Sequence, residues 1–189
     1  MLEGIHTILR EIEERRSGRA YDPDKPVSDE MINSILEAGR RAPSCGNAQA
    51  WNFIVIRDPA VREKANEGMS RGNYWAARAP VMIIVAARPD GGCPAHKLPY
   101  FMMDVGLAVE NMLLQGVHLG LIAHPTAGWR EEVLGEVIGL PEEYRIAAVV
   151  FFGFEGDASH LSEKHLAQEQ IRSPRRPFEE VVHWDRWQL

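Results

Sequence analysis

Two short apolar runs constrain the fold of this chain more than any other feature of its sequence. Residues 79–87 and 146–154 are almost entirely apolar, and residues 81–87 are rich in β-branched side chains. A strand that is apolar on both faces is covered by helices on both sides, so we expect residues 81–87 to be central in a sheet. The first run is less than half of the roughly 20 residues that cross a bilayer, and a glycine interrupts the second, so we expect no transmembrane segment.

Helical patterns surround these two runs. Apolar residues at helical spacing predict helices that begin near Ile5, Ser28 and residue 60, a long helix over residues 101–121 and another over residues 130–138. Residues 51–56 alternate as a first strand would. The order predicts a layered α/β/α domain with a small sheet, followed by an irregular tail over residues 155–189. The polar residues of the long helix share one narrow stripe, which predicts that most of its surface is buried: Asp104, Asn111, Gln115 and His118.

The composition indicates one globular domain over residues 1–189. The chain has 45% hydrophobic and 25% charged residues, and folding at this length buries a substantial core without disulfides or a structural metal. With only two cysteines, Cys45 and Cys93, and no signal peptide, the chain suits a reducing compartment, and we expect the cytoplasm. With 27 acidic and 21 basic residues the net charge is −6, which disfavours nucleic acid as a partner.

The tail contains too much apolar surface to remain in water. It includes Phe178, Val181, Trp184 and Trp187, after the proline-punctuated residues 173–177. Either the tail packs back on its own domain, or it wraps a second copy of the chain as an exchanged arm in a homodimer.

Two basic clusters and two small-residue loops could bind a ligand. Residues 15–19 and 172–176 combine arginines with serines, and guanidinium groups match the oxygens of a phosphate. Short arginine runs are also common on solvated surfaces, so the sequence alone leaves both interpretations open. Residues 42–51 could let backbone approach a flat polar ligand, and residues 124–129 precede a helix whose free N–H groups favour negative charge. Loops of this composition also occur without a ligand.

Segments spread along nearly the whole chain carry a resemblance to one family. Residues 15–21 read RRSGRAY, residues 42–53 read APSCGNAQAWNF, residues 125–129 read PTAGW, and residues 175–182 read RRPFEEVV. With the long helix and the Gly139-Leu140-Pro141 turn between them, their order and spacing resemble the FMN-dependent nitroreductase family. The resemblance implies an α+β class, with a three-layer α/β/α sandwich, a mainly antiparallel central sheet and a C-terminal arm exchanged between subunits. It also implies that FMN lies at a homodimer interface.

The resemblance also implies a set of cofactor-binding residues. The phosphate and ribityl chain of FMN would lie against Arg15, Arg16, Ser17 and Arg19, together with Arg175 or Arg176. The second subunit would line the flavin with Pro43, Ser44, Cys45, Asn47 and Gln49. Backbone groups near the flavin ring would come from Pro125, Thr126, Ala127 and Gly128, and Asn73 matches an amide that contacts the ring.

The chain departs from the family pattern at several positions. Family members often carry an acidic residue at the position of Ala127, a lysine near Ser173 and a proline at the position of Ala50. Arg172 could replace the lysine as a phosphate partner. Residues 88–100 are a short segment where larger relatives place a helical lid, so the sequence does not indicate substrate selectivity.

The remaining candidates are weaker. Cys93 and His96 have metal-ligand spacing without a second pair, so we expect no metal site. Cys45 has no identifiable base beside it, and no acid–base triad is expected because the cofactor performs the chemistry.

The resemblance implies an FMN oxidoreductase that passes electrons from NADH or NADPH to a small electron-poor acceptor, such as a nitroaromatic or quinone, by a ping-pong mechanism. An alternative is a flavin-binding sensor, store or partner subunit with little turnover. A third hypothesis is an anion-binding module without flavin.

Overall fold

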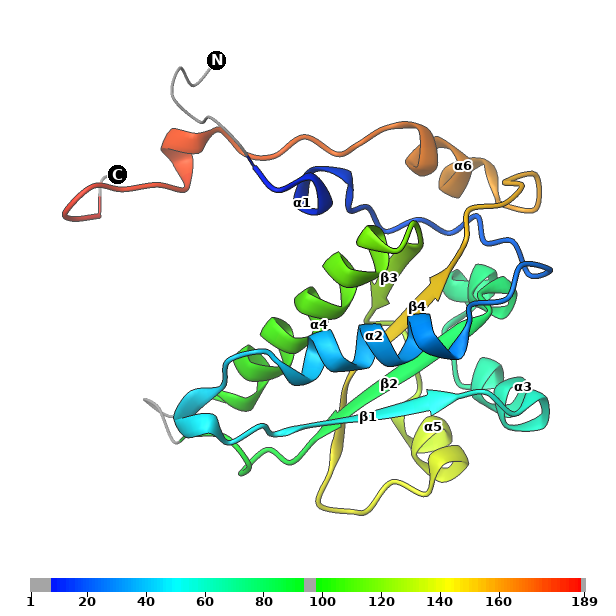
Figure 1. Ribbon diagram of the computed structural model, residues 1–189, viewed down its shortest axis with the longest axis horizontal. Coiled ribbons are helices and arrows are strands. Elements are labelled where there is room, and N and C mark those ends of the chain that lie inside the picture. The colour runs from blue at the N-terminus through cyan, green and yellow to red at the C-terminus, as the bar shows by residue number, and fades with distance from the viewer. Residues whose placement is uncertain (1–7, 94–97, 188–189) are drawn as a thin grey trace.

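A four-stranded antiparallel sheet forms the centre of the computed structural model, which describes residues 8–93 and 98–187. The strand order is β1-β2-β4-β3, as Figure 1 shows, with β1 (Trp51–Ile56), β2 (Val81–Ala87), β3 (Ile122–Thr126) and β4 (Arg145–Gly153). Every residue of β2 is buried, which confirms the prediction of a central strand. The sequence did not predict β3, because it is short and contains Pro125. An edge strand tolerates proline, which has no N–H to donate to a neighbour.

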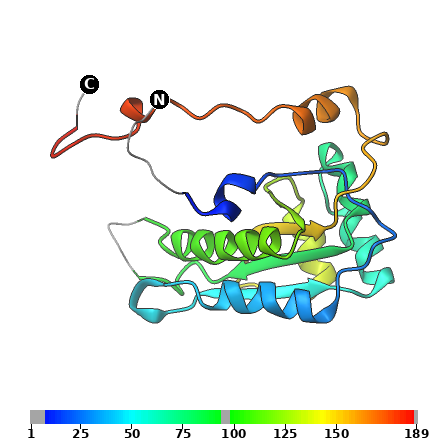
Figure 2. The ribbon, with the colours of Figure 1, turned by 45° about the horizontal axis from the view of Figure 1, so that its top comes forward.

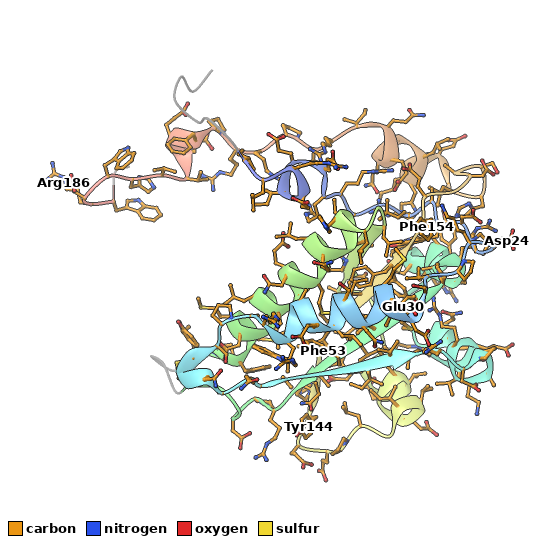
Figure 3. The ribbon with its side chains drawn as sticks, in the orientation of Figure 1. Asp24, Glu30, Phe53, Tyr144, Phe154 and Arg186 are labelled. Atoms are coloured by element: carbon orange, nitrogen blue, oxygen red, sulfur yellow. A yellow bond between two sulfur atoms is a disulfide. The ribbon has the colours of Figure 1, made fainter. Side chains whose placement is uncertain are left out.

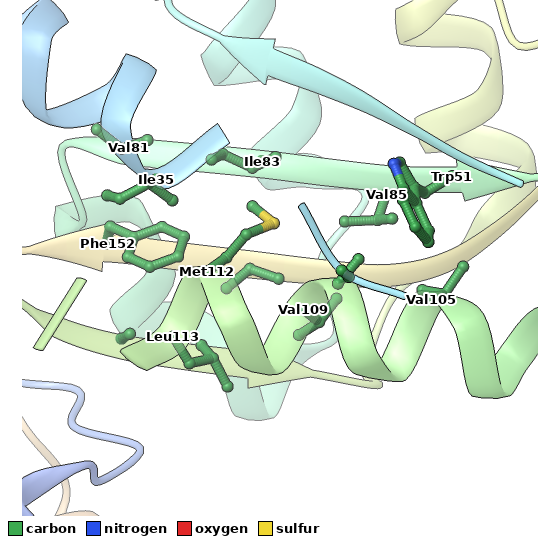
Figure 4. Close-up of a cluster of buried hydrophobic side chains, with 14 of the residues drawn as sticks. Ile35, Trp51, Val81, Ile83, Val85, Val105, Val109, Met112, Leu113 and Phe152 are labelled. Carbon is green, nitrogen blue, oxygen red and sulfur yellow. The ribbon is translucent and has the colours of Figure 1, made fainter. Parts of the chain in front are cut away.

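Helices cover both faces of the sheet and make three layers, as Figure 2 shows. On one face, α2 (Asp29–Arg40) and α4 (Phe101–His118) pack against the strands, with Ile35, Met112 and Phe152 in the buried cluster of Figure 4. On the other face lie α3 (Pro59–Glu67), the 3-10 helix η2 (Arg71–Arg78) and α5 (Glu131–Ile138). Successive strand residues alternate between the two cores, as Phe151 and Phe152 do. The predicted three-layer α+β class is confirmed.

Local signals in the sequence account for several helix ends. The Ser28 hydroxyl accepts a hydrogen bond from the Met31 N–H at 3.3 Å and starts α2, and Asp58 caps α3 in the same way. Gly139, with a φ of +63°, ends α5 in the left-handed conformation that glycine adopts readily. The first helix, α1 (Arg10–Glu14), is shorter than predicted within the described residues, and Ile5 lies outside them.

The polar stripe of α4 faces protein at Asp104, Asn111 and Gln115 and solvent at His118, and most residues of the helix are buried or half-buried, as predicted. Asp104 is 1% exposed, and the side-chain amides of Asn111 and Gln115 donate hydrogen bonds to α2. A neighbouring face, with Met103 and Leu107, is exposed. Apolar patterning alone does not tell which side of a helix its own chain covers.

The tail was expected to be irregular, but part of it is helical. It contains α6 (Glu163–Gln170), capped by Ser162 and built from good helix formers, and a short 3-10 helix, η3 (Phe178–Glu180). Beyond α6, residues 171–187 form an arm that runs away from the sheet, and Figure 3 shows Arg186 far from both cores. Trp184 and Trp187 are 71% and 76% exposed. Of the two alternatives for the tail, packing on its own domain is therefore not observed at the end of this arm.

A disulfide joins Cys45 and Cys93, with their Cα atoms 5.7 Å apart, and corrects the expectation that the fold would use no disulfide. The sheet register explains the pairing. Trp51, the first residue of β1, pairs with Ala87, the last residue of β2. Cys45 lies six residues before Trp51 and Cys93 lies six residues after Ala87, so the two cysteines leave the same end of the strand pair. The assumption of a reducing compartment therefore loses its basis in the cysteines. The bond ties the short 3-10 helix η1 (Cys45–Asn47) to the segment that follows β2, residues 88–100, of which residues 94–97 lie outside the described part.

Candidate functional site

The two basic clusters meet in one cavity of about 390 Å³, here called the arginine cavity. Residues from α1 and the following turn form one side, and residues from α6 and the start of the arm form the other. Arg172 donates a hydrogen bond from Nη2 to the carbonyl oxygen of Arg15 at 3.3 Å, which ties the two sides together. The lining includes five arginines and two serines that the sequence analysis named: Arg15, Arg16, Ser17, Arg19, Arg172, Ser173 and Arg175.

The charge inside the arginine cavity favours an anion. Glu169 is the acidic residue in the lining, and it forms ion pairs with Arg16 at 2.8 Å and with Arg19 at 3.4 Å. Burial by itself lowers the pKa of Arg16, but its ion pairs with Glu155 and Glu169 outweigh burial and raise that pKa above the usual value. Five arginines therefore line the cavity and two carboxylates, Glu155 and Glu169, pair with them, so positive charge remains for a bound anion.

Arg176 does not line the arginine cavity. Its guanidinium donates from Nε to Oε2 of Glu180, and from Nη2 to the carbonyl oxygen of the same residue, both at 3.1 Å. Of the two arginines between which the resemblance left the choice open, only Arg175 lines this cavity.

A buried histidine links the arginine cavity to β3. His124 is 7% exposed, its ring centroid lies 4.3 Å from that of Trp75, and its Nδ1 lies 3.1 Å from the carbonyl oxygen of Gly18. Burial, with a further contribution from Arg19, lowers the pKa of His124 to about 4. The ring is therefore neutral at pH 7, and Nδ1 carries the proton that it donates to Gly18. This role of His124 was not predicted from the sequence, although its place after two apolar residues and before a proline was a signal.

The next residues of β3 lead into the predicted ring-binding segment, residues 125–128. Asn73 donates from Nδ2 to the Thr126 hydroxyl and to the Gly128 carbonyl oxygen, both at 2.9 Å, and Ser70 N–H donates to that carbonyl as well. A Cβ atom on Gly128 would lie only 2.6 Å from Nδ2 of Asn73, so this close approach requires glycine. Ala127 is exposed. The structure thus brings Asn73 and residues 125–128 together, as the sequence analysis grouped them, and it places Thr126 in a strand rather than a loop.

The 43–49 loop lies at the other end of α4. Cys45 N–H donates to Oδ1 of Asp104 near the start of α4, whereas His118 at its end contacts Glu11 of α1 at 2.9 Å. Fourteen residues of helix separate these two contacts, a distance of about 20 Å. Pro43, Ser44, Cys45, Asn47 and Gln49 are therefore not gathered around the arginine cavity of their own chain.

The conformation of the 43–49 loop is strained. Gly46, Asn47 and Gln49 have φ values of +57°, +58° and +50°; glycine and asparagine tolerate this region, whereas glutamine rarely adopts it. The disulfide, the Asp104 hydrogen bond and a bond from Gln49 N–H to the Ser44 hydroxyl at 3.0 Å hold it in place. The Asn47 and Gln49 side chains are exposed. Strained, exposed polar loops of this kind cluster at binding sites.

Among the described residues, no group of three or more histidine, cysteine, aspartate or glutamate side chains could hold a metal ion. Of the pair with metal-ligand spacing, Cys93 is bonded to Cys45 in the disulfide, and His96 lies outside the described residues. No helix in the described part is long and apolar enough to cross a membrane.

Comparison with known proteins identifies the family of the chain. The family model "Nitroreductase family" matches residues 12–73 and 68–154. An Archaeoglobus fulgidus protein, named as a candidate NADH dehydrogenase or NAD(P)H nitroreductase, is 34% identical over 97% of this chain and 100% of its own length. An FMN reductase [NAD(P)H] of Bacillus subtilis is 27% identical over 95% of this chain and 74% of its own. A crystal structure described as an oxidoreductase containing FMN superimposes with a TM-score of 0.85 at 27% identity, over 98% of this chain and 96% of that one. The match spans the sheet, both helical layers and the 125–128 segment, and shows that the chain belongs to the nitroreductase family.

Proposed function

We propose that the chain is an FMN-dependent oxidoreductase that passes electrons from NADH or NADPH to a small electron-poor acceptor, such as a nitroaromatic or quinone. The observation that carries this proposal is the arginine cavity and its link through His124 to the 125–128 segment. When bound, FMN supplies the chemistry, because its ring accepts two electrons from the nicotinamide and gives them to the acceptor in a second half-reaction. The names of the relatives support the same electron donor and cofactor.

The residues of the chain bind and orient the cofactor in this proposal. Arg15, Arg16, Ser17, Arg19 and Arg175 hold the phosphate end, because charge-assisted hydrogen bonds to phosphate oxygens are strong. Neutral His124 fixes the 17–19 turn against β3, and so sets the distance between the phosphate end and the ring end. Asn73 holds the 125–128 segment, which offers its backbone groups to the ring.

A homodimer completes the proposed site. The 43–49 loop lies about 20 Å along α4 from α1 of its own chain, so a second subunit supplies this loop to the ring. The exposed apolar face of α4, with Met103 and Leu107, and the exposed arm, with Trp184 and Trp187, are the surfaces that such a partner covers.

The first experiment is the absorbance spectrum of the purified protein, followed by release and identification of the chromophore. We expect bound FMN, its reduction by NADH or NADPH without oxygen, and steady turnover with a quinone. A yellow protein that the nicotinamides do not reduce would favour the flavin-binding protein with little turnover. A colourless protein whose melting temperature FMN does not raise would contradict any flavin function.

A further inference from the structure

The carboxylate of Glu169 accepts three hydrogen bonds inside the arginine cavity. Oε2 accepts from Nη1 of Arg16 at 2.8 Å, and Oε1 accepts from the backbone N–H of Arg19 at 3.0 Å and from Nη1 of Arg19 at 3.4 Å. The Glu169 side chain is only 8% exposed. A backbone N–H and two guanidinium groups that converge on oxygen atoms of one anion are the donor set of a phosphate site.

A phosphate ester and the Glu169 carboxylate cannot share these donors. Both are negative, and each would place its oxygen atoms within about 3 Å of the same nitrogen atoms. Either the carboxylate leaves when the ligand arrives, or it remains and the phosphate binds elsewhere in the cavity.

The attachment of α6 favours departure of the carboxylate. None of the residues of α6 belongs to either hydrophobic core. At the end of α6, Glu169 and the Arg172 bond to the Arg15 carbonyl oxygen at 3.3 Å hold it to the body. At its start, Ser162 N–H donates to Oη of Tyr74 at 2.6 Å, and the rings of His165 and Tyr74 lie 5.5 Å apart. The segment after α6 is exposed, so the end of the helix that carries Glu169 can move without opening either core.

We propose that Glu169 is a built-in competitor that determines which anions the arginine cavity accepts. In the ligand-free chain its carboxylate keeps Arg16 and Arg19 in place, and a phosphomonoester displaces it. An anion with one charge would replace an equal charge that is already tethered in position, so it gains little. A phosphomonoester carries up to two charges and three acceptor oxygens, and it gains from the remaining arginines as well.

The proposal rests on the proposed function only for the identity of the phosphomonoester, which is FMN. The first test compares the affinity of the wild-type protein, Glu169→Gln and Glu163→Gln for FMN and for inorganic phosphate by calorimetry, after removal of bound flavin. We expect Glu169→Gln to bind both probes about fivefold more tightly, and acetate to compete with them measurably in this variant but not in the wild type. Glu163→Gln is the matched control on the same helix, outside the cavity lining, and we expect a change of less than about twofold.

A second test uses the wild-type protein alone and does not depend on the folding of a variant. We expect amide hydrogen exchange in α6 to become faster when inorganic phosphate or FMN binds, because the ligand releases the Glu169 end of the helix. Weaker binding of both probes by Glu169→Gln, or greater protection of α6 on binding, would overturn the proposal. If the wild-type protein binds inorganic phosphate as described but not FMN, then the competitor role stands and the proposed flavin function fails. If it binds neither probe, the competitor role fails as well.

Discussion

The two ends of α4 hold their neighbouring segments by different physical means. At its C-terminal end, charged hydrogen bonds and a neutral buried histidine shape the arginine cavity. At its N-terminal end, a disulfide and the buried carboxylate of Asp104 hold a strained loop. The first region is adjustable, because ion pairs can exchange partners, whereas a covalent bond fixes the second. Under the proposed function, the cavity end captures the ligand and the loop end presents a rigid surface to it.

The strongest test of this comparison is to prevent the arginine cavity of one chain from meeting the 43–49 loop of the second chain. Under the proposed dimer, removal of residues 178–189 exposes the partner's apolar surface and separates the cavity of one chain from the loop of the other. We expect a monomer by light scattering, loss of bound FMN and a normal circular dichroism spectrum, because the arm belongs to neither core. A shortened chain that stays dimeric and retains all its flavin would contradict the exchanged arm.

The disulfide at the loop end should contribute to the stability of the chain. We expect Cys93→Ser to lower the free energy of unfolding by about 2–4 kcal/mol, because the bond closes a loop of 48 residues in the unfolded chain. Urea unfolding measures this loss, and a reductant should bring the wild-type protein to the same value. Affinity for inorganic phosphate should stay unchanged, since the bond lies at the far end of α4. If a reductant leaves the stability of the wild-type protein unaltered, the disulfide does not hold this loop.

The same two ends show what the sequence could and could not predict. Alternation and helical periodicity were enough for the central strand, the three layers and most helix bounds, because these signals are local. The motifs also grouped the arginines that the structure gathers in one cavity. The disulfide depends on the register of β1 against β2, and the Glu169 ion pairs join residues about 150 positions apart. Such pairings follow from tertiary packing, which no local pattern in one sequence specifies.

The affinity of the arginine cavity for FMN should depend on single charges. We expect Arg19→Ala to weaken FMN binding by about 1.5–3 kcal/mol, the range for a charge-assisted hydrogen bond. Equilibrium dialysis or flavin fluorescence measures the change. Arg176→Ala is the control, because that arginine pairs with Glu180 outside the cavity, and it should alter the affinity little. Equal losses in the two variants would show that net charge, rather than this cavity, governs binding.

The link between the cavity and β3 should be sensitive to pH. His124 has a pKa of about 4 in the folded chain and an ordinary value of 6.5, so the unfolded chain binds more protons between these values. Stability from this residue is therefore complete above pH 6.5 and is lost as the pH falls towards 4. Between pH 7 and pH 5 we expect a loss of about 2 kcal/mol.

Denaturant unfolding of the wild-type protein and His124→Asn at both pH values isolates this contribution. Asparagine does not titrate and can still donate to the Gly18 carbonyl, so the variant should lose less stability on acidification. An identical pH dependence in the two proteins would remove His124 as the cause.

The smallest effect on flavin binding and reduction is expected from substitution of Ala127, which directly follows β3. Its side chain is exposed, and the neighbouring hydrogen bonds involve the Thr126 hydroxyl and the Gly128 backbone. If backbone groups of this segment meet the flavin, then Ala127→Ser should leave FMN affinity, midpoint potential and the rate of anaerobic reduction by NADH or NADPH nearly unchanged. Gly128→Val is the contrast, because its Cβ would collide with Nδ2 of Asn73, which holds the segment in place. That variant should impair both binding and reduction. A Gly128→Val protein that is reduced as fast as its parent, at the same potential, would show that residues 125–128 lie away from the flavin.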